Sequence, residues 1–313
     1  MPFVSVIIPT RPGQAEIPAV HASRAFDYPR DRLEIIVARG RHPAVQRNAA
    51  LRQARGELIY FLDDDACAPP QNLRLAVAHF KDTDVKLVGG PSLCPGDAPL
   101  LEKIFAVTLA SWLAFGPSRA RYDAVGAVRA TSEKELILCN LLGRREELLA
   151  MGGFDESLYP NEENALMDEL QKRGAKLIYD PQLIVYRRPR PTLRAFVKML
   201  LGYGRGRAEQ FRLHPTPGAA LNFVPPLFCL YLLIAPWLGR MGLIPLGFYF
   251  VAVTAQTFVS MLRKDFLEGL LALPLIVLTH LGYGLGFWRG LFTRLKKSGD
   301  TPVTEVALEQ VAV

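Results

Sequence analysis

The stretch ELIYFLDDDACAPP, residues 57–70, joins an apolar run to three consecutive aspartates. The run before the aspartates is leucine-, isoleucine- and aromatic-rich, which predicts a buried strand. Neighbouring carboxylates repel one another, and ionised groups near a sheet end are costly unless they are paired with a cation or well solvated. The stretch therefore predicts a strand end that holds a positive group, with a solvated acidic turn as the alternative.

The segments around this stretch have the order of strands and helices that is typical of an α/β domain. Short apolar runs predict buried strands and intervening amphipathic segments predict helices, with Pro43 in the first turn of one helix and Gly56 as its stop. The predicted strands are 3–9, 32–40, 57–65 and 85–91, and the predicted helices are 42–56 and 72–80. This order predicts a mostly parallel sheet, in which ligands bind outside the carboxyl ends of the strands. The aspartates lie at such an end.

Residues 135–189 continue the same pattern as strand, helix, acidic loop, helix and strand, and Gly174 is expected to end the second helix. The segment 99–116 is apolar but contains Glu102 and Lys103 and is shorter than the roughly 20 residues of a comfortable membrane span. We expect it to form a helix that packs on the domain or dips into a membrane interface.

Three apolar runs in the C-terminal region are each about long enough to cross a bilayer: 219–239, 241–262 and 267–288. The basic residues before, between and after these runs are all expected on the cytoplasmic side. Three full crossings would place the tail outside, so we expect one run, either the Pro-Pro-bearing first or the glycine-rich third, to be re-entrant or interfacial. The predicted domains are thus a catalytic domain 1–212 with a basic interfacial segment 187–212, a transmembrane region 219–290 with two to three helices, and a tail 291–313.

Charge and cysteine content narrow the class of partner. The net charge is +7 and the sequence pI is about 9.3, and arginine and lysine concentrate in the segment 187–212 just ahead of the apolar runs. This position favours membrane headgroups and phosphate-bearing ligands over nucleic acid. The N-terminus lacks the pattern of a signal peptide, so the first domain is expected in the cytosol. The four cysteines have no CxxC spacing and predict neither a zinc site nor a disulfide framework.

Alternation along an extended chain divides the three aspartates between two sides. Asp63 and Asp65 are expected on one side and Asp64 on the other. A D-x-D pair at a ligand-binding edge suits a hard divalent cation, Mg²⁺ or Mn²⁺, shared with phosphate oxygens.

Five blocks in order, VSVIIPT, EIIVARG, QRNAALRQARGELIYFLDDD, GGFDE and NEENALMDELQKRGAKLIYDP, resemble the family 2 glycosyltransferases of GT-A fold over about two-thirds of the chain. That family uses a nucleotide-activated sugar and a divalent metal and inverts the anomeric carbon. The C-terminal apolar runs and GYGRGRA are similar to membrane-bound exopolysaccharide enzymes of the succinoglycan glucosyltransferase type.

The resemblance implies donor contacts at several positions. Asp63 corresponds to the aspartate that meets the ribose and Asp65 to the metal ligand, with Asp64 between them. Further implied donor-binding residues are Pro9, Thr10, Arg11, Arg47 and Asn48. For Asn48 an exposed helix turn is an equal alternative. The family usually carries an acidic pair after the second strand, but this sequence has Ala38, Arg39 and Gly40 there, which puts the nucleotide in doubt; Arg39 either touches a phosphate or faces solvent.

The segment PNEENALMDE, 160–169, carries the implied catalytic pair. By the residue preferences of helix N-termini alone, Asn161 is a cap. Glu162 and Glu163 are then acidic residues of the first turn, which the helix dipole favours. The resemblance instead aligns Glu163 with the base that takes the acceptor proton and Glu162 with its partner. Which of the two glutamates is the base stays open. The loop at Gly152, Gly153, Phe154 and Asp155 is implied to lie beneath the acceptor.

Arg205 and Arg207, in GYGRGRA, stand where processive relatives carry Q-x-x-R-W, but the glutamine and tryptophan are absent, so processive polymerisation is not supported. These arginines either stabilise the leaving diphosphate or bind lipid headgroups. His280 lies in an apolar run and is expected to be a packed or interfacial residue.

The sequence thus predicts a metal-dependent hexosyltransferase of the inner membrane, multi-pass, with its catalytic domain facing the cytoplasm. It would move a sugar, from a UDP-sugar by expectation, to a lipid-linked saccharide in cell-surface polysaccharide synthesis. The alternatives are a polyprenyl-phosphate glycosyltransferase and a non-catalytic, membrane-anchored nucleotide-sugar-binding subunit. A transporter is disfavoured because no pair of interrupted helices carries intramembrane acidic residues.

Overall fold

The computed structural model describes residues 1–158, 161–213, 215, 217–295 and 305–313. The chain forms two compact units. The first contains Met1–Pro95, Ala120–Arg187 and Lys296–Val313, and the second contains Gly96–Arg119 and Arg188–Leu295.

The first unit is built on a mixed sheet with the strand order β10-β2-β1-β3-β7-β4-β8-β6. Within the described residues its strands are β1 (Val4–Thr10), β2 (Leu33–Arg39), β3 (Leu58–Leu62), β4 (Val85–Gly89), β6 (Arg129–Ala130), β7 (Asn140–Arg144), β8 (Lys176–Tyr179) and β10 (Ala307–Val311). A second small sheet pairs β5 (Ser92–Leu93) with β9 (Val185–Tyr186). Strands β2, β1, β3, β4 and β8 run in one direction, and β7 is inserted antiparallel between β3 and β4. The predicted α/β architecture with mostly parallel strands is confirmed.

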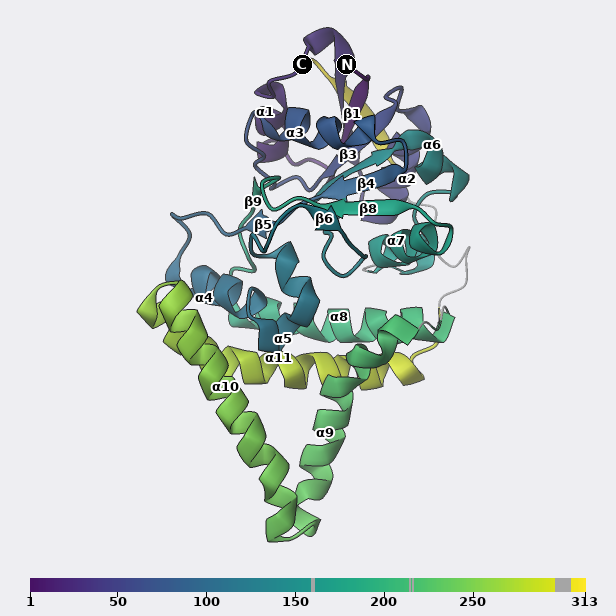
Figure 1. Cartoon of the computed structure of the whole chain (residues 1–313). Coiled ribbons are helices and arrows are strands. Elements are labelled where there is room, and N and C mark those ends of the chain that lie inside the picture. The colour runs from purple at the N-terminus through teal and green to yellow at the C-terminus, as the bar shows by residue number, and fades with distance from the viewer. Residues whose placement is uncertain (159–160, 214, 216, 296–304) are drawn as a thin grey trace. The chain divides into compact units, whose positions relative to one another are not determined.

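Helices cover both faces of this sheet (Figure 1). Alternate residues of β1 point to opposite faces: Val6 and Ile8 join one apolar core and Ile7 joins the other. The first core includes residues of α1 (Pro18–Arg24) and α3 (Asn72–Ala78). The second includes residues of α2 (Pro43–Gln53), α6 (Arg145–Ala150) and α7 (Glu162–Lys172). Because helices cover both faces, a ligand can reach this sheet at the ends of its strands.

Several predicted boundaries were wrong, each for a local reason. Helix α2 ends at Gln53, before the predicted stop at Gly56. Gly56 instead lies against β1, where a Cβ would come within 2.5 Å of the Ser5 amide nitrogen. The segment 99–116 is broken into α4 (Leu100–Leu109) and α5 (Trp112–Phe115), because Ser111 caps α5 by accepting a hydrogen bond from the Ala114 amide at 3.3 Å.

The C-terminal tail returns to the first unit, which the sequence did not predict. Strand β10 pairs antiparallel with β2 and places Leu308 opposite Ala38. Side chains reinforce the pairing: Gln310 donates to Glu34 at 2.9 Å, and Glu309 accepts from the Arg39 Nε at 3.0 Å. Without the tail, β2 would be an edge strand of the sheet. The tail therefore covers the backbone edge of β2.

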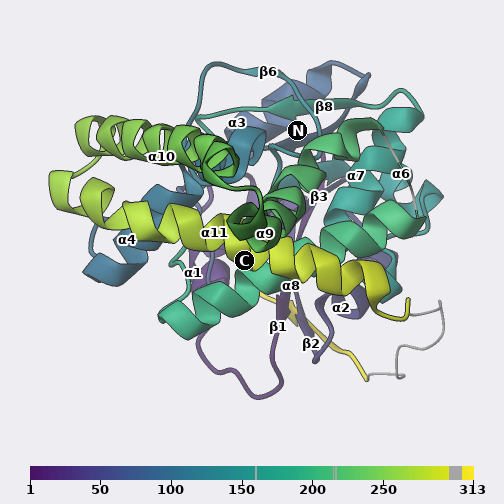
Figure 2. The same cartoon turned by 90° about the horizontal axis from the view of Figure 1, so that it is seen from below.

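The second unit holds the long apolar helices. Its main helices are α8 (Leu193–Leu213), α9 (Val224–Ile234), α10 (Ile244–Arg263) and α11 (Phe266–Phe292). Three segments are long and apolar enough to cross a membrane: Ala220–Trp237, Arg240–Arg263 and Phe266–Phe292. Figures 1 and 2 both show α8 beside α11, and glycines make this approach possible. A Cβ at Gly286 would meet the Leu201 carbonyl oxygen at 2.2 Å, so only glycine allows these backbones so close.

Candidate functional site

The three aspartates follow β3 at the carboxyl end of the sheet, beside the end of β1. Their side chains have different partners. Asp64 accepts a hydrogen bond from the Thr10 hydroxyl at 3.3 Å, whereas Asp63 and Asp65 both contact Arg187. The predicted division, with Asp63 and Asp65 together and Asp64 apart, agrees with these contacts.

Arg187 is the residue that the sequence analysis missed. It follows β9, and its guanidinium bridges the two aspartates: Nη1 lies 3.1 Å from Asp63 Oδ2 and Nε lies 2.8 Å from Asp65 Oδ1. Burial alone would lower the pKa of Arg187, but Asp63 and the other nearby acidic groups raise it well above its ordinary value. A fixed positive charge therefore stands between the two carboxylates.

The carboxyl group of Asp65 responds to the same surroundings. Burial raises its pKa above the ordinary value, and the negative charges of Asp63 and Asp64 add to this, while Arg187 opposes it. Although 48% of the Asp65 side chain is exposed to solvent, the neighbouring carboxylates keep the charge density high. Removing Arg187 without a replacement cation would thus leave several like charges close together.

A second arginine connects the aspartates to helix α7. Arg47, in the first half of α2, contacts Asp63 Oδ1 through Nη2 at 2.8 Å and Glu162 Oε1 through Nη1 at 3.3 Å. Arg47 and Glu162 are 5% and 2% exposed. Glu162 and Glu163 lie in the first turn of α7, as helix capping alone predicted, and the Glu162 carboxylate is in addition buried against α2. The order Glu162, Arg47, Asp63, Arg187, Asp65 forms a continuous chain of alternating charge.

The pKa of the Glu162 carboxyl group is strongly shifted. Burial and the nearby Glu163 raise its pKa to about 8, while Arg47 opposes the shift. Burial wins because a carboxylate without water loses more solvation than one 3.3 Å contact with a guanidinium returns. Glu163, the next residue, is only partly buried, and its Oε1 accepts from Asn164 Nδ2 at 3.4 Å. The pair thus combines a buried acid with an accessible one.

The start of α7 is fixed from neighbouring elements. Asn161 stands at the N-cap position, as predicted, and its Oδ1 accepts from Asn164 Nδ2 at 2.6 Å. The Arg121 guanidinium also donates to the Asn164 side-chain oxygen and, through Nε, to the Lys134 carbonyl at 2.9 Å. The loop before β7 thereby holds the helix end that carries the two glutamates.

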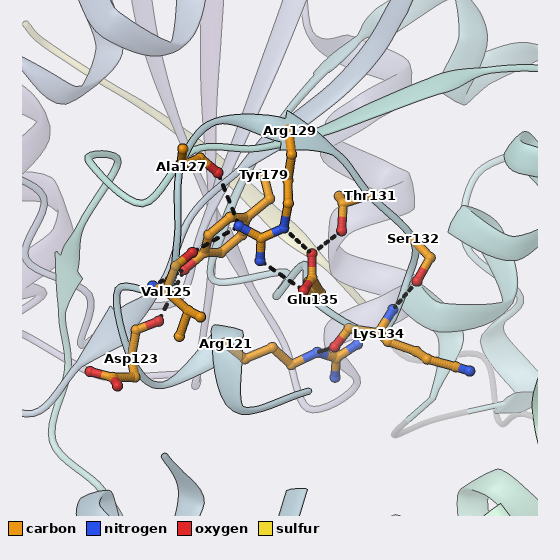
Figure 3. A network of polar contacts seen from close by, with 10 residues as sticks. All are labelled: Arg121, Asp123, Val125, Ala127, Arg129, Thr131, Ser132, Lys134, Glu135 and Tyr179. Carbon is orange, nitrogen blue, oxygen red and sulfur yellow. Dashed lines mark hydrogen bonds and ion pairs between the residues drawn. The ribbon is translucent and has the colours of Figure 1, made fainter. Parts of the chain in front are cut away.

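Figure 3 shows the network of polar contacts within this loop and from the loop to Tyr179. Arg129 binds Glu135 with two nitrogens at 2.8 and 3.1 Å and lies 4.4 Å from the centre of the Tyr179 ring. The Tyr179 hydroxyl donates to the Asp123 carbonyl at 3.0 Å. Thr131 donates its hydroxyl to Glu135. These contacts tie the loop to strand β8 and so to the sheet.

Asn48 anchors the glycine loop. Its amide exchanges hydrogen bonds with the Phe154 backbone, accepting from the nitrogen and donating to the oxygen, both at 2.8 Å. It also donates to Glu156 at 2.9 Å. At 4% exposed, Asn48 is not on an exposed helix turn, so that alternative is wrong. Gly153 has φ +82°, and a Cβ there would lie 2.4 Å from the Asn48 Oδ1. The side chain of Asp155 accepts two hydrogen bonds from Ser157 at the exposed end of this loop.

Four more of the predicted donor-binding residues lie at or just beyond the ends of β1 and β2. Thr10 closes β1 next to Pro9, and Arg11 beyond it is exposed. Gln46, which the sequence analysis did not single out, is buried beneath them and donates to the Thr10 carbonyl at 2.8 Å. Arg39 is held by the Gln14 carbonyl at 2.8 Å and by Glu309 of the tail. A contact with the tail was neither of the two options that the sequence offered for Arg39.

Arg205 and Arg207 belong to the second unit, on α8. Arg205 pairs with Glu209 one turn later at 3.4 Å, and Arg207 donates to Gln210 at 3.2 Å. His280 bonds to the Leu113 carbonyl at 2.8 Å and to the Tyr249 hydroxyl at 2.7 Å. The expectation that His280 is a packed residue is confirmed.

Comparison with known proteins shows which proteins the chain resembles. Residues 21–103, which contain β2, α2, β3 and the three aspartates, match the model of glycosyl transferase family 2. This match covers about a quarter of the chain. It is 32% identical over 196 residues to the succinoglycan biosynthesis protein ExoA of Rhizobium meliloti, covering 61% of this chain and 56% of that protein. It is 29% identical over 184 residues to the pre-mycofactocin glycosyltransferase of Mycobacterium tuberculosis (strain CDC 1551 / Oshkosh), covering 57% of this chain and 37% of that protein.

The GT-A fold of this chain is also seen in a solved structure. The mannosyltransferase PcManGT from Pyrobaculum calidifontis, in complex with GDP-Man and Mn²⁺, matches with a TM-score of 0.56 and 18% identity, covering 93% of this chain and 87% of that one. The chain spans only about half, or less, of the length of the curated relatives it matches. The likeness to the solved structure establishes the fold.

Proposed function

We propose that the protein is a membrane-associated inverting glycosyltransferase that moves a sugar from a nucleotide-sugar, UDP-linked by expectation, to a lipid-linked saccharide. The observation that carries the proposal is the chain of charges from Asp65 to Glu162. It joins the aspartates at the strand end to the acidic pair on α7 through Arg187 and Arg47. The chain ends at Glu162, next to Glu163, so the residues proposed to bind a diphosphate are linked to the residue that precedes the proposed base.

In the proposed reaction the acceptor hydroxyl attacks the anomeric carbon as the diphosphate leaves, and its proton passes to Glu163. Glu163 suits this role because it is the accessible member of the pair, while Glu162 is buried against Arg47. Glu162 positions the helix start and tunes the charge near Glu163. The loop Gly153–Asp155, held by Asn48, is proposed to support the acceptor.

Binding of the donor is proposed to use the ends of β1 and β3. Thr10 and Asp63 lie at these ends and are proposed to contact the nucleoside of the donor. Pro9, Arg11 and Asp64 lie beside them. Arg47 and Arg187 place two positive charges at the aspartates, where negative charge develops on the leaving diphosphate. Arg205 and Arg207 remain candidates for the diphosphate or for lipid headgroups.

The residues at this edge fit a divalent ion. Asp63 and Asp65 offer hard carboxylate oxygens, and the Arg187 guanidinium between them supports the proposal that this place takes a positive charge. Among the described residues no group of three or more acidic, histidine or cysteine side chains forms a full cage. Mg²⁺ and Mn²⁺ would take their other ligands from phosphate and water, as such ions commonly do. When bound, the ion would help neutralise the leaving diphosphate.

The three candidate spans support the proposal that the enzyme is a multi-pass protein of the inner membrane whose catalytic domain faces the cytoplasm. An acceptor carried by a lipid would then meet the donor site at the bilayer plane. ExoA is named for succinoglycan biosynthesis, and synthesis of a cell-surface polysaccharide is the role proposed here by that likeness.

The proposal is tested by incubating purified protein with a panel of nucleotide-sugars, Mn²⁺ and lipid extract, and measuring release of the nucleoside diphosphate. One donor is expected to give release that depends on the lipid extract. Metal-dependent nucleotide binding with no transfer or hydrolysis of any donor would favour a non-catalytic binding subunit instead.

A further inference from the structure

The C-terminal strand fixes how many times the chain can cross a membrane. Strand β10 pairs with β2, and β9 ends at Tyr186, so the chain enters and leaves the helical segment 188–295 from the same folded unit. A folded unit lies on one side of a bilayer. The number of crossings between Arg187 and Ala307 must therefore be even. Three candidate spans cannot all cross.

The same reasoning applies to α4 and α5. Pro95 before them and Ala120 after them both belong to the first unit. A single crossing of the bilayer by the segment between them is therefore excluded. Its two helices are bent by 63° at the break and together are too short for two crossings. Helices α4 and α5 therefore stay on the side of the sheet domain or at the membrane interface.

Helix α11 packs on α5 and α8, which do not cross, as well as on α9 and α10. Near its middle, His280 bonds to Leu113 of α5. Its C-terminal half runs beside α8 through close glycine contacts, from Gly282 against Leu200 to Gly290 against Arg205. Helix α8 carries basic residues along its length, namely Arg194, Lys198, Arg205, Arg207 and Arg212. Such a helix belongs to the headgroup layer and not to the hydrocarbon.

Helices α9 and α10 have the opposite character. Most of their large apolar side chains are exposed, among them Leu227, Leu230, Leu233, Phe248, Phe250, Val251, Phe258 and Leu262. The spans Ala220–Trp237 and Arg240–Arg263 contain 18 and 24 residues, about 27 and 36 Å as helices, which suits a hydrocarbon core of about 30 Å. The turn between them contains exposed Arg240, a charge that needs water.

We infer that α9 and α10 form a hairpin that crosses the bilayer twice, with Arg240 on the far side, while α11 lies in the interface beside α8. The partner of the exposed α9 and α10 faces is lipid hydrocarbon. This inference rests on the membrane association in the proposed function and not on the transfer reaction. It also places Arg263 and Lys264 on the same side as the sheet domain, as their charge favours.

The test uses Arg240→Cys and Lys264→Cys variants of the full chain in right-side-out and inside-out membrane vesicles. A membrane-impermeant maleimide is added, and labelling is read peptide by peptide by mass spectrometry. Cys67, which is exposed in the first unit, reports the side of the sheet domain in the same experiment. Nucleotide binding to each variant confirms that the sheet domain is folded.

We expect the thiol introduced by Arg240→Cys to label from the face opposite Cys67, and the thiol introduced by Lys264→Cys to label from the same face as Cys67. If the Lys264→Cys thiol labels opposite Cys67 and the Arg240→Cys thiol does not, then α10 and α11 are the crossing pair and the inference fails. If both introduced thiols label from the face of Cys67, the hairpin is re-entrant, no segment crosses, and the inference fails as well. These outcomes do not depend on transfer activity, so a failed activity assay leaves this result readable.

Discussion

Substitution of Arg187 by glutamine tests the charge balance of the site most sharply. The guanidinium makes two contacts of 2.8 and 3.1 Å with Asp65 and Asp63, and its side chain is 23% exposed. Loss of one partner from a buried ion pair costs about 3–5 kcal/mol. Because Asp65 is about half exposed, we take the lower end and expect the free energy of unfolding of the first unit to fall by about 3 kcal/mol without divalent metal.

The assay is hydrogen exchange of the β1 and β3 amides in detergent-solubilised protein, which reports the free energy of opening of the sheet. Arg173→Gln is the matched control, since Arg173 makes a surface pair with Glu169 at 3.1 Å and should cost no more than about 0.5 kcal/mol. Adding Asp65→Asn to Arg187→Gln should restore part of the loss, because one of the crowded charges is then removed.

Divalent metal supplies a second reading of the same substitution. If Arg187 holds the place of a cation, Mn²⁺ in the absence of nucleotide should protect Arg187→Gln more than the parent protein. The reasoning is refuted if Arg187→Gln is as stable as the Arg173→Gln control and Mn²⁺ protects both proteins equally.

Three further predictions concern single groups. Asp65→Ala should abolish metal-dependent activity, whereas Asp64→Ala should mostly reduce stability because its partner is Thr10; equal activity losses would contradict the division. Glu162 binds a proton more tightly in the folded chain, with a pKa of about 8 against an ordinary 4.5, so stability should fall as pH rises from about 4.5 to about 8 and then level off. Thermal unfolding of Glu162→Gln should lack that decline, and an unchanged pH profile would refute the assignment. Gly152→Ala and Gly153→Ala share a positive φ, but only the second meets Asn48, so Gly153→Ala should lose about 1 kcal/mol more in denaturant unfolding; equal losses would refute the anchoring role.

Short-range pattern accounts for most of what the sequence predicted correctly. Strands β1, β2 and β3 are buried on both faces and read as apolar runs, so their ends could be located and Asp63, Asp64 and Asp65 placed at an edge. Arg47 and Glu162 were singled out separately, and their contact joins residues 115 positions apart.

The features that were missed depend on long-range pairing. Arg187 was assigned to a basic membrane segment because its neighbours Arg188 and Arg190 are also basic, and the strand β9 that aims it at Asp65 has only two residues. The tail strand β10 is short and mostly exposed, and its partner β2 lies some 270 residues earlier. No local pattern in a single sequence reports such pairings.

Transfer by Glu163→Gln tests the central claim most directly. With the donor that supports nucleoside diphosphate release, labelled sugar is followed into the lipid fraction for the parent protein and for the variant, and donor affinity is measured by calorimetry. The account predicts that the variant binds the donor as the parent does and transfers little or no sugar. Near-normal transfer by Glu163→Gln would contradict a base-assisted attack by a hydroxyl acceptor and would favour a phosphate acceptor instead.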